Sequence, residues 1–96
     1  MESRQEHRYT ASPETVLVSI LNSRQERRFA ARLLDISKSG CSMASPQALA
    51  PSRNILVVMD RLAIFGTVRR CQRADGGRFR VGVEITRLEL AGEAAA

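Results

Sequence analysis

The stretch Phe79-Arg80-Val81-Gly82-Val83-Glu84-Ile85 decides the fold class, because every second residue along it is large and apolar. A period of two places alternate side chains on the same face of a β-strand, so that one face is buried and the other meets solvent. Directly before it, Asp75-Gly76-Gly77 is typical of a tight hairpin turn, since both glycines accept a positive φ without strain. The stretch therefore predicts the second strand of an antiparallel hairpin.

The rest of the chain repeats this pattern. Five further strands are predicted over residues 15–21, 29–34, 41–44, 54–59 and 62–72, with polar, Gly-rich or Pro-rich turns between them. In the longest of these strands Gly66 indicates a bulge or a bend, because it has no side chain to pack. Six short strands favour an antiparallel all-β domain closed into a small barrel, which removes exposed edges. The tail over 86–96, with many Ala and Glu residues, is predicted to form a short C-terminal helix.

Length and composition limit the number of domains and the cellular setting. A chain of 96 residues builds one modest core, and we expect a flexible arm over residues 1–12 and a barrel domain over 13–96. No apolar run is long enough to span a membrane, and the polar N-terminus is unlike a signal sequence, so a cytoplasmic protein is expected. Cys41, Cys71 and the single histidine, His7, have no zinc-binding spacing. Free thiols and no metal or other cofactor are predicted.

The charge balance favours an anionic partner. The chain has 15 basic and 10 acidic residues, a formal net charge of +5, and Lys38 is its only lysine. The arginine guanidinium is a planar fork that pairs with phosphate or with a guanine edge and also stacks on bases. A bias toward arginine can equally reflect a GC-rich genome, so composition alone does not name the partner.

Two short motifs carry the groups that could hold such a ligand. Arg4 and Arg8 in Arg4-Gln5-Glu6-His7-Arg8 project to the same side of the arm and could converge on a phosphate or a guanine edge. Asp35-Ile36-Ser37-Lys38-Ser39-Gly40 follows the second predicted strand. Asp35 and Ser37 are separated by a single residue, Ile36, so both should face the same way along a strand, and Gly40 would let the backbone turn. The carboxylate could accept hydrogen bonds from guanine N1–H and N2–H.

The order and spacing of these motifs resemble the PilZ domain family, whose members carry Arg-x-x-x-Arg before the first strand and [Asp/Asn]-x-Ser-x-x-Gly after the second. The resemblance extends to 66–70, similar to the family's fifth strand, and to 80–85, similar to its closing Val-Gly-Val-x-Phe stretch. It implies a six-stranded barrel with a C-terminal helix that binds the bacterial second messenger cyclic di-GMP. Ile85 replaces the closing Phe, and Arg69 or Arg70 stands near a position where many members have Trp.

The resemblance also implies the roles of individual residues. Arg4 and Arg8 would clamp phosphates and guanine edges, Asp35 and Ser37 would hold a guanine, and Gly40 would shape the turn. We expect the arm to fold over the ligand, which would change a surface that a downstream effector protein can recognise.

Three alternatives are weighed against this receptor hypothesis. An enzyme is disfavoured, because the sequence offers no set of nucleophile, base and orienting residue. A basic barrel that binds RNA or single-stranded DNA is also disfavoured, since such platforms stack bases on aromatic side chains. Here Phe29, Phe65 and Phe79 fall in apolar strand patterns, which leaves Tyr9. The third alternative is a PilZ-like barrel that acts only as a protein-interaction module.

Overall fold

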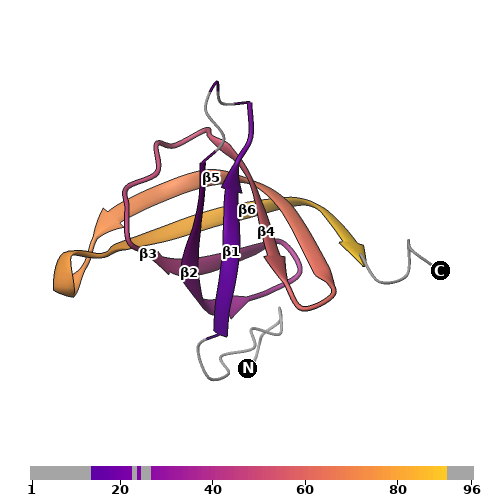
Figure 1. The fold of residues 1–96 in the computed structure, drawn as a ribbon, viewed down its shortest axis with the longest axis horizontal. Helices are drawn as coiled ribbons and strands as arrows, with labels where there is room; N and C mark the ends of the chain where they lie inside the picture. Colours follow the sequence, from indigo (N-terminus) through magenta and orange to yellow (C-terminus); the bar gives the residue numbers. More distant parts are fainter. Residues whose placement is uncertain (1–13, 23, 25–26, 91–96) are drawn as a thin grey trace.

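The structure is a computed structural model, and it describes residues 14–22, 24 and 27–90. The described chain forms six antiparallel strands, which close in the order β1-β2-β3-β6-β5-β4 (Figure 1). Their bounds are β1 Glu14–Ile20, β2 Arg27–Ile36, β3 Gly40–Ser45, β4 Asn54–Met59, β5 Leu62–Arg73 and β6 Phe79–Leu90. The prediction of a six-stranded antiparallel barrel is confirmed.

One core fills the barrel, and it is built from the residues that alternate inward along each strand. Val18, Met43, Val57 and Val81 are fully buried there, and Leu49 from the loop between β3 and β4 closes one side. Alternate positions point outward, as a half-buried antiparallel sheet requires. This division of faces matters for function, because any ligand site must lie on the outer surface or at an open end.

The longest hairpin joins β5 to β6 and extends beyond the body of the barrel (Figure 1). Its turn is a short 3-10 segment, η1, over Asp75–Gly77, in which Gly76 has a φ of 74° and Gly77 a φ of 72°. The predicted need for positive φ at both glycines is therefore confirmed. The ladder shifts register between Phe65 and Gly66, which confirms an irregularity at Gly66. A Cβ on Gly66 would lie 2.7 Å from the Glu84 carbonyl oxygen, so the two strands approach too closely there for a side chain.

The predicted C-terminal helix is wrong where the structure describes it. Residues 86–90 continue β6 and pair with the first half of β5, down to Leu62 opposite Leu90. The helix propensity of Leu and Glu is a weak preference, and the backbone ladder that β5 offers overrides it. Residues 91–96 lie outside the described part of the chain, as does the predicted N-terminal arm over residues 1–12.

Candidate functional site

A shallow cleft of about 350 Å³ lies on the outer surface of the barrel, where the end of β2 meets β3, β6 and β5. Its volume is at the lower end of the range for small-molecule sites in proteins. Its lining includes Asp35, Ser37, Ser42, Arg70, Arg80 and Gly82. The cross-strand register explains their meeting, since Asp35 pairs with Ser42, Ser42 with Gly82, and Gly82 with Arg70. One row across four strands thus forms the floor.

A bulge in β2 brings Asp35 into this row. Leu33 pairs with Met43 and Asp35 with Ser42, so Leu34 is an extra residue without a partner on β3. Leu33 faces the core, and strict alternation would have turned Asp35 toward the core as well. The bulge resets the alternation and places Asp35 opposite Ser42, on the outer face. Its carboxylate is 12% exposed, and Oδ2 lies 3.8 Å from Arg80 Nη2.

A second bulge supplies positive charge on the opposite side of the cleft. Val68 pairs with Val83 and Arg70 with Gly82, so Arg69 is an extra residue in β5. As a result both Arg69 and Arg70 line the cleft and are exposed, although they are neighbours in sequence. Arg69 donates to the Glu84 carboxylate, whereas Arg70 makes no ion pair with any described residue. Arg70 is therefore placed to meet a ligand anion.

Gly82 forms the centre of the floor. It lies between Ser42 on β3 and Arg70 on β5, and its missing side chain leaves the depression open. A Cβ at this position would be 3.6 Å from Arg70 Cβ, an ordinary van der Waals contact. The barrel would thus accept a side chain at Gly82, and what the glycine preserves is space in the cleft.

Ser37 and Gly40 build the wall next to Asp35. The Ser37 hydroxyl donates to the Gly40 carbonyl oxygen at 3.2 Å, and the Ser37 backbone N–H donates to the same oxygen at 2.7 Å. Ser37 lines the cleft but is only 7% exposed. Its hydroxyl proton holds the turn closed, which leaves the hydroxyl oxygen to accept a bond from a ligand.

The reason for glycine at position 40 differs from the one predicted. Gly40 does not have a positive φ, so the turn does not depend on its conformational freedom. Instead, a Cβ on Gly40 would lie 2.8 Å from the Val83 carbonyl oxygen. Gly40 is needed because β3 begins in close contact with β6, and this contact joins the wall of the cleft to its floor.

Two further groups lie at the floor of the cleft. Burial, with a smaller contribution from the negative charge of Asp35, raises the pKa of the Cys41 thiol to about 11. The thiol is therefore neutral at physiological pH and packs as an apolar group. The Ser42 hydroxyl oxygen is buried and has no hydrogen-bond partner among the described residues. A buried polar group without a partner is uncommon and costs free energy, so this hydroxyl is an unfavourable feature of the cleft floor.

The structure thus brings together three of the five predicted site residues, Asp35, Ser37 and Gly40, in one cleft. The other two, Arg4 and Arg8, lie outside the described residues. Four further cleft residues were not predicted from the sequence: Ser42, Arg70, Arg80 and Gly82. For Arg80 and Gly82 a signal was present, because the alternation of the last strand already placed both on its outer face. Arg70 reaches the cleft because of the bulge at Arg69, and no sequence pattern indicates that bulge.

Comparison with known protein families gives a match over almost the whole chain. A family model described as the PilZ domain matches residues 2–95. The chain belongs to the PilZ domain family. PilZ domains are regulatory receptors and adaptors for cyclic di-GMP, and they are not enzymes. Among curated proteins no significant match was found.

This PilZ domain also resembles a solved structure, the Bacillus subtilis inhibitor of motility (MotI/DgrA). The TM-score is 0.61 at 14% sequence identity, and the match covers 99% of this chain and 48% of the other. The PilZ chain therefore spans about half the length of that protein, and at this identity the likeness supports the fold. In the described part of the chain no helix is long and apolar enough to cross a membrane, and no group of side chains could hold a metal ion.

Proposed function

We propose that this PilZ domain binds cyclic di-GMP in the cleft between β2, β3, β6 and β5 and passes the signal to a downstream protein in the bacterial cytoplasm. The observation that carries the proposal is the placement of Asp35. A bulge turns its carboxylate out of the core, into a cleft that also contains Arg69 and Arg70 of β5 and Arg80 of β6. An anionic acceptor beside cationic donors matches a ligand that has guanine N–H groups and phosphates.

Each side of the ligand then has a complementary group. The Asp35 carboxylate accepts from guanine N1–H and N2–H, with the Ser37 oxygen beside it. Arg80, which lies next to Asp35, and Arg70 on β5 would supply charge-assisted hydrogen bonds to a phosphate, or to the O6 and N7 edge of guanine. The Gly82 floor admits a flat base against the sheet. This binding reaction needs no metal ion or other cofactor.

The arm adds the second half of the proposed site. Arg4 and Arg8 match the family's Arg-x-x-x-Arg motif and would close over the ligand, so that the ligand lies between the arm and the cleft. Ordering the arm costs conformational entropy, but it couples ligand binding to a new surface that an effector protein can recognise. Amide exchange over the first ten residues should slow when cyclic di-GMP is added, and unchanged exchange at saturation would remove the switch while leaving binding intact.

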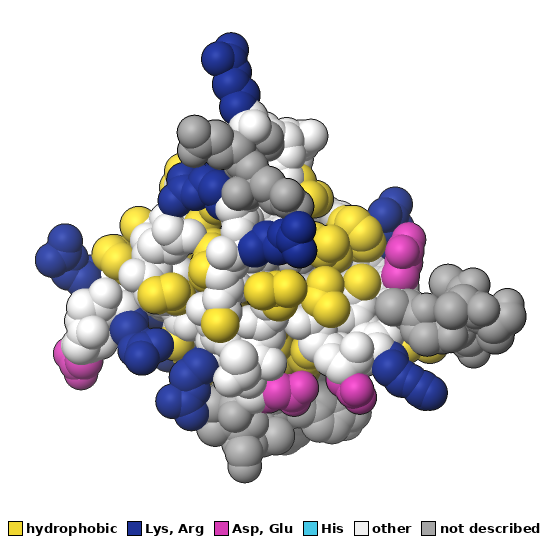
Figure 2. Space-filling model, viewed as in Figure 1, with side chains coloured by type: hydrophobic (Ala, Val, Ile, Leu, Met, Phe, Trp, Pro, Cys, Tyr) yellow, Lys and Arg dark blue, Asp and Glu magenta, His cyan; other side chains and the backbone are white. Residues whose placement is uncertain are grey.

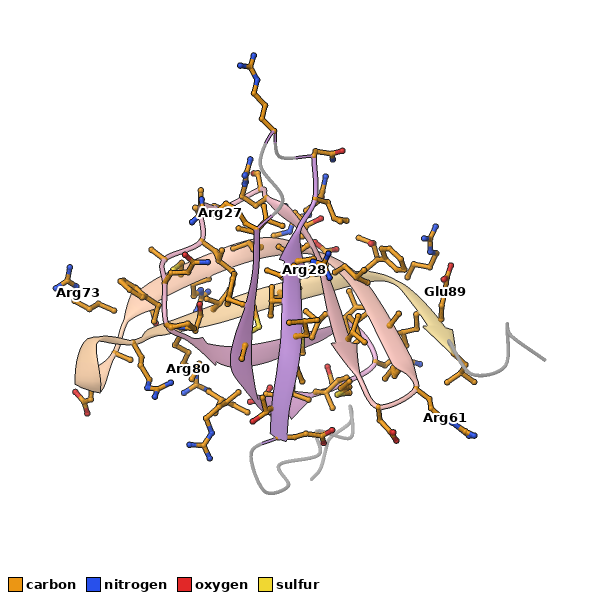
Figure 3. All side chains as sticks on the ribbon, viewed as in Figure 1. Arg27, Arg28, Arg61, Arg73, Arg80 and Glu89 are labelled. Atoms are coloured by element: carbon orange, nitrogen blue, oxygen red, sulfur yellow. The ribbon has the colours of Figure 1, made fainter. Side chains whose placement is uncertain are left out.

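Calorimetric titration of the full chain with cyclic di-GMP tests the proposal, with GTP as the comparison ligand. We expect micromolar or tighter binding of cyclic di-GMP. Asp35→Ala and Arg8→Ala should each weaken it roughly tenfold to more than a hundredfold, because each removes a charge-assisted hydrogen bond. Arg61→Ala is the matched control, since Arg61 lies at the tip of the β4–β5 hairpin, well away from Arg80 (Figure 3).

Two outcomes would contradict this function. A folded chain that binds no cyclic di-GMP would leave the protein-interaction module as the better description. Equal losses in Arg61→Ala and Asp35→Ala would mean that general positive charge, and not the cleft, attracts the ligand. The process that is regulated depends on the effector. Since the structurally similar Bacillus subtilis protein is named as an inhibitor of motility, motility is the first output to assay.

A further inference from the structure

The far end of β6 has an unpaired edge. β3 pairs with β6 only up to Gly40 opposite Glu84, and the last backbone bond on this side runs from Ile85 N–H to the Ser39 carbonyl oxygen at 2.9 Å. β5 continues to pair with β6 as far as Leu90. Residues 86–90 therefore have β5 on one side, and no described strand on the other. Figure 1 shows this end of β6, in yellow, projecting past β3.

The two faces of this segment differ in chemistry. Leu88 pairs with the fully buried Ile64, so it lies on the core side of the sheet, and Leu90 shares this side. Yet Leu88 is 48% exposed and Leu90 is 55% exposed, because the barrel wall does not extend over them. Arg87 and Glu89 lie on the outer face, where Arg87 Nε is 3.0 Å from Glu89 Oε2. Figure 3 shows Glu89 at the projecting end. An open edge with exposed leucines is a site where another strand can add.

We infer that a second copy of this chain occupies the edge, and that two β6 strands pair antiparallel about a two-fold axis through Leu88. In this register Leu88 meets the partner's Leu88, and Arg87 meets the partner's Glu89 on the outer face. The second Arg–Glu pair follows by symmetry. Opposite charges directly across a strand pair stabilise it, and like charges oppose it. The order Arg-Leu-Glu is therefore complementary to itself in the antiparallel direction, as a two-fold interface requires.

The pairing also accounts for the exposed apolar groups. The four leucines, two from each chain, form a strip on the core side that neither chain covers alone. Each edge gains backbone hydrogen bonds that among the described residues it otherwise lacks. The cleft lies on the other half of β6, around Gly82, so the dimer leaves it accessible.

Sedimentation velocity over micromolar to millimolar concentrations measures the assembly. We expect the wild-type chain to reach twice its monomer mass. Leu88→Lys should raise the dissociation constant about tenfold or more, because it brings two charges together at the axis. Leu17→Lys is the matched control, a leucine of similar exposure (42%) on the outer face of β1. A wild-type chain that stays monomeric throughout would overturn the inference, and so would equal losses in the two variants.

Charge exchange tests the register itself. Arg87→Glu and Glu89→Arg should each weaken self-association about tenfold, since each places like charges opposite one another twice. The double variant should recover. An equimolar mixture of the two single variants should form a heterodimer, because one chain then presents two glutamates to two arginines. Arg87 also lies 4.1 Å from the Phe65 ring centre, so circular dichroism must show that both single variants are folded. Folded variants that do not recover on mixing would refute this pairing.

Discussion

Gly82 and Gly40 both belong to the cleft, but the absence of a side chain is required at each position for a different reason. A Cβ on Gly82 meets only ordinary contacts, whereas a Cβ on Gly40 would press on the backbone of β6. Gly82 thus keeps space for a ligand, and Gly40 keeps two strands together. The difference allows binding and folding to be separated by single substitutions.

Gly82→Val should abolish cyclic di-GMP binding without unfolding the barrel. The valine side chain fills the floor of the cleft, while the strand gains a residue with high β propensity. The free energy of unfolding should change by less than about 0.5 kcal/mol, as is usual for a surface substitution. Calorimetry and urea denaturation measure the two effects. Undiminished binding in Gly82→Val would mean that the ligand does not reach this floor.

Gly40→Ala, unlike Gly82→Val, should lower the free energy of unfolding. The added methyl group is forced against the Val83 carbonyl oxygen, and such overpacking costs typically about 1 to 3 kcal/mol. The midpoint of urea denaturation should fall accordingly. A variant as stable as the wild type would show that β3 and β6 can separate at this point without cost.

The Cys41 thiol makes stability depend on pH in the alkaline range. Its pKa rises from 9.0 to about 11 on folding, mainly through burial. Between these two pH values the thiol ionises readily only in the unfolded chain. The contribution of the neutral Cys41 thiol to the free energy of unfolding is therefore complete below about pH 9 and is lost as pH rises toward 11. Relative to Cys41→Val, the wild type should lose roughly 2 to 3 kcal/mol over that interval. Parallel pH profiles of the two proteins would contradict the buried, neutral thiol.

At the scale of elements, the ladder between β5 and β6 sets the charge of the cleft. The Arg69 bulge turns two consecutive arginines outward, and Glu84 on β6 neutralises one of them. Both members of this ion pair are more than half exposed, at 58% and 51%, so the pair itself adds at most about 1 kcal/mol to stability. Its main effect is on the potential that an incoming anion meets.

Glu84→Gln should therefore tighten cyclic di-GMP binding. It removes a negative charge from the rim and frees Arg69 for a phosphate, which is worth roughly a three- to tenfold gain in affinity. Asp75→Asn, which removes a negative charge from the distant η1 turn, is the matched control and should change little. Titration of both variants decides the point, and a weaker Glu84→Gln complex would mean that Glu84 itself contacts the ligand.

The elements also show how far the sequence determines the structure. Period-two alternation located all six strands, and the glycine pair located the β5–β6 turn, because both are local properties. The bulges at Leu34 and Arg69 were not predictable, since each arises from register between strands distant in sequence. The predicted C-terminal helix failed for a related reason. Leu88 and Leu90 fit a helix locally, but β5 offers them a strand partner.

The same limit applies to the candidate site. Asp35, Ser37 and Gly40 could be selected because a motif joins them within six residues. Arg70 and Arg80 become their neighbours only when β3, β6 and β5 are placed side by side. Residues that come from different paired strands share no local sequence pattern. The arginines of the cleft could therefore be identified only from the folded structure.

At the scale of the whole molecule, positive charge on the face seen in Figure 2 is scattered and is not gathered in one stripe. Basic side chains lie at separate points of its outline, with acidic groups between some of them and apolar side chains across the middle of that face. A protein that tracks a nucleic-acid backbone needs a continuous basic surface. The distribution therefore favours a small anionic ligand.

Salt dependence should separate these two kinds of partner. Nucleic-acid complexes with six to ten phosphate contacts lose roughly 10³- to 10⁵-fold in affinity between 50 and 200 mM salt. For cyclic di-GMP, with two phosphates, we expect a loss of less than about tenfold over this range, because close ion pairs in a cleft are only partly screened. Titrations at several salt concentrations, with single-stranded RNA as the comparison, measure both slopes. Tight RNA binding with a steep slope would favour the nucleic-acid alternative.

The barrel closes where β1 meets β4, and this seam has only four residue pairs, from Leu17–Val58 to Ile20–Ile55, whereas β5 and β6 share eleven. The described cleft residues all lie away from this seam, on β2, β3, β6, β5 and the turn between β2 and β3. Neither strand of the seam therefore contributes a residue to the cleft. The inward side chains of β1 and β4 answer to core packing alone, whereas the strands opposite must satisfy both the core on one face and a ligand on the other.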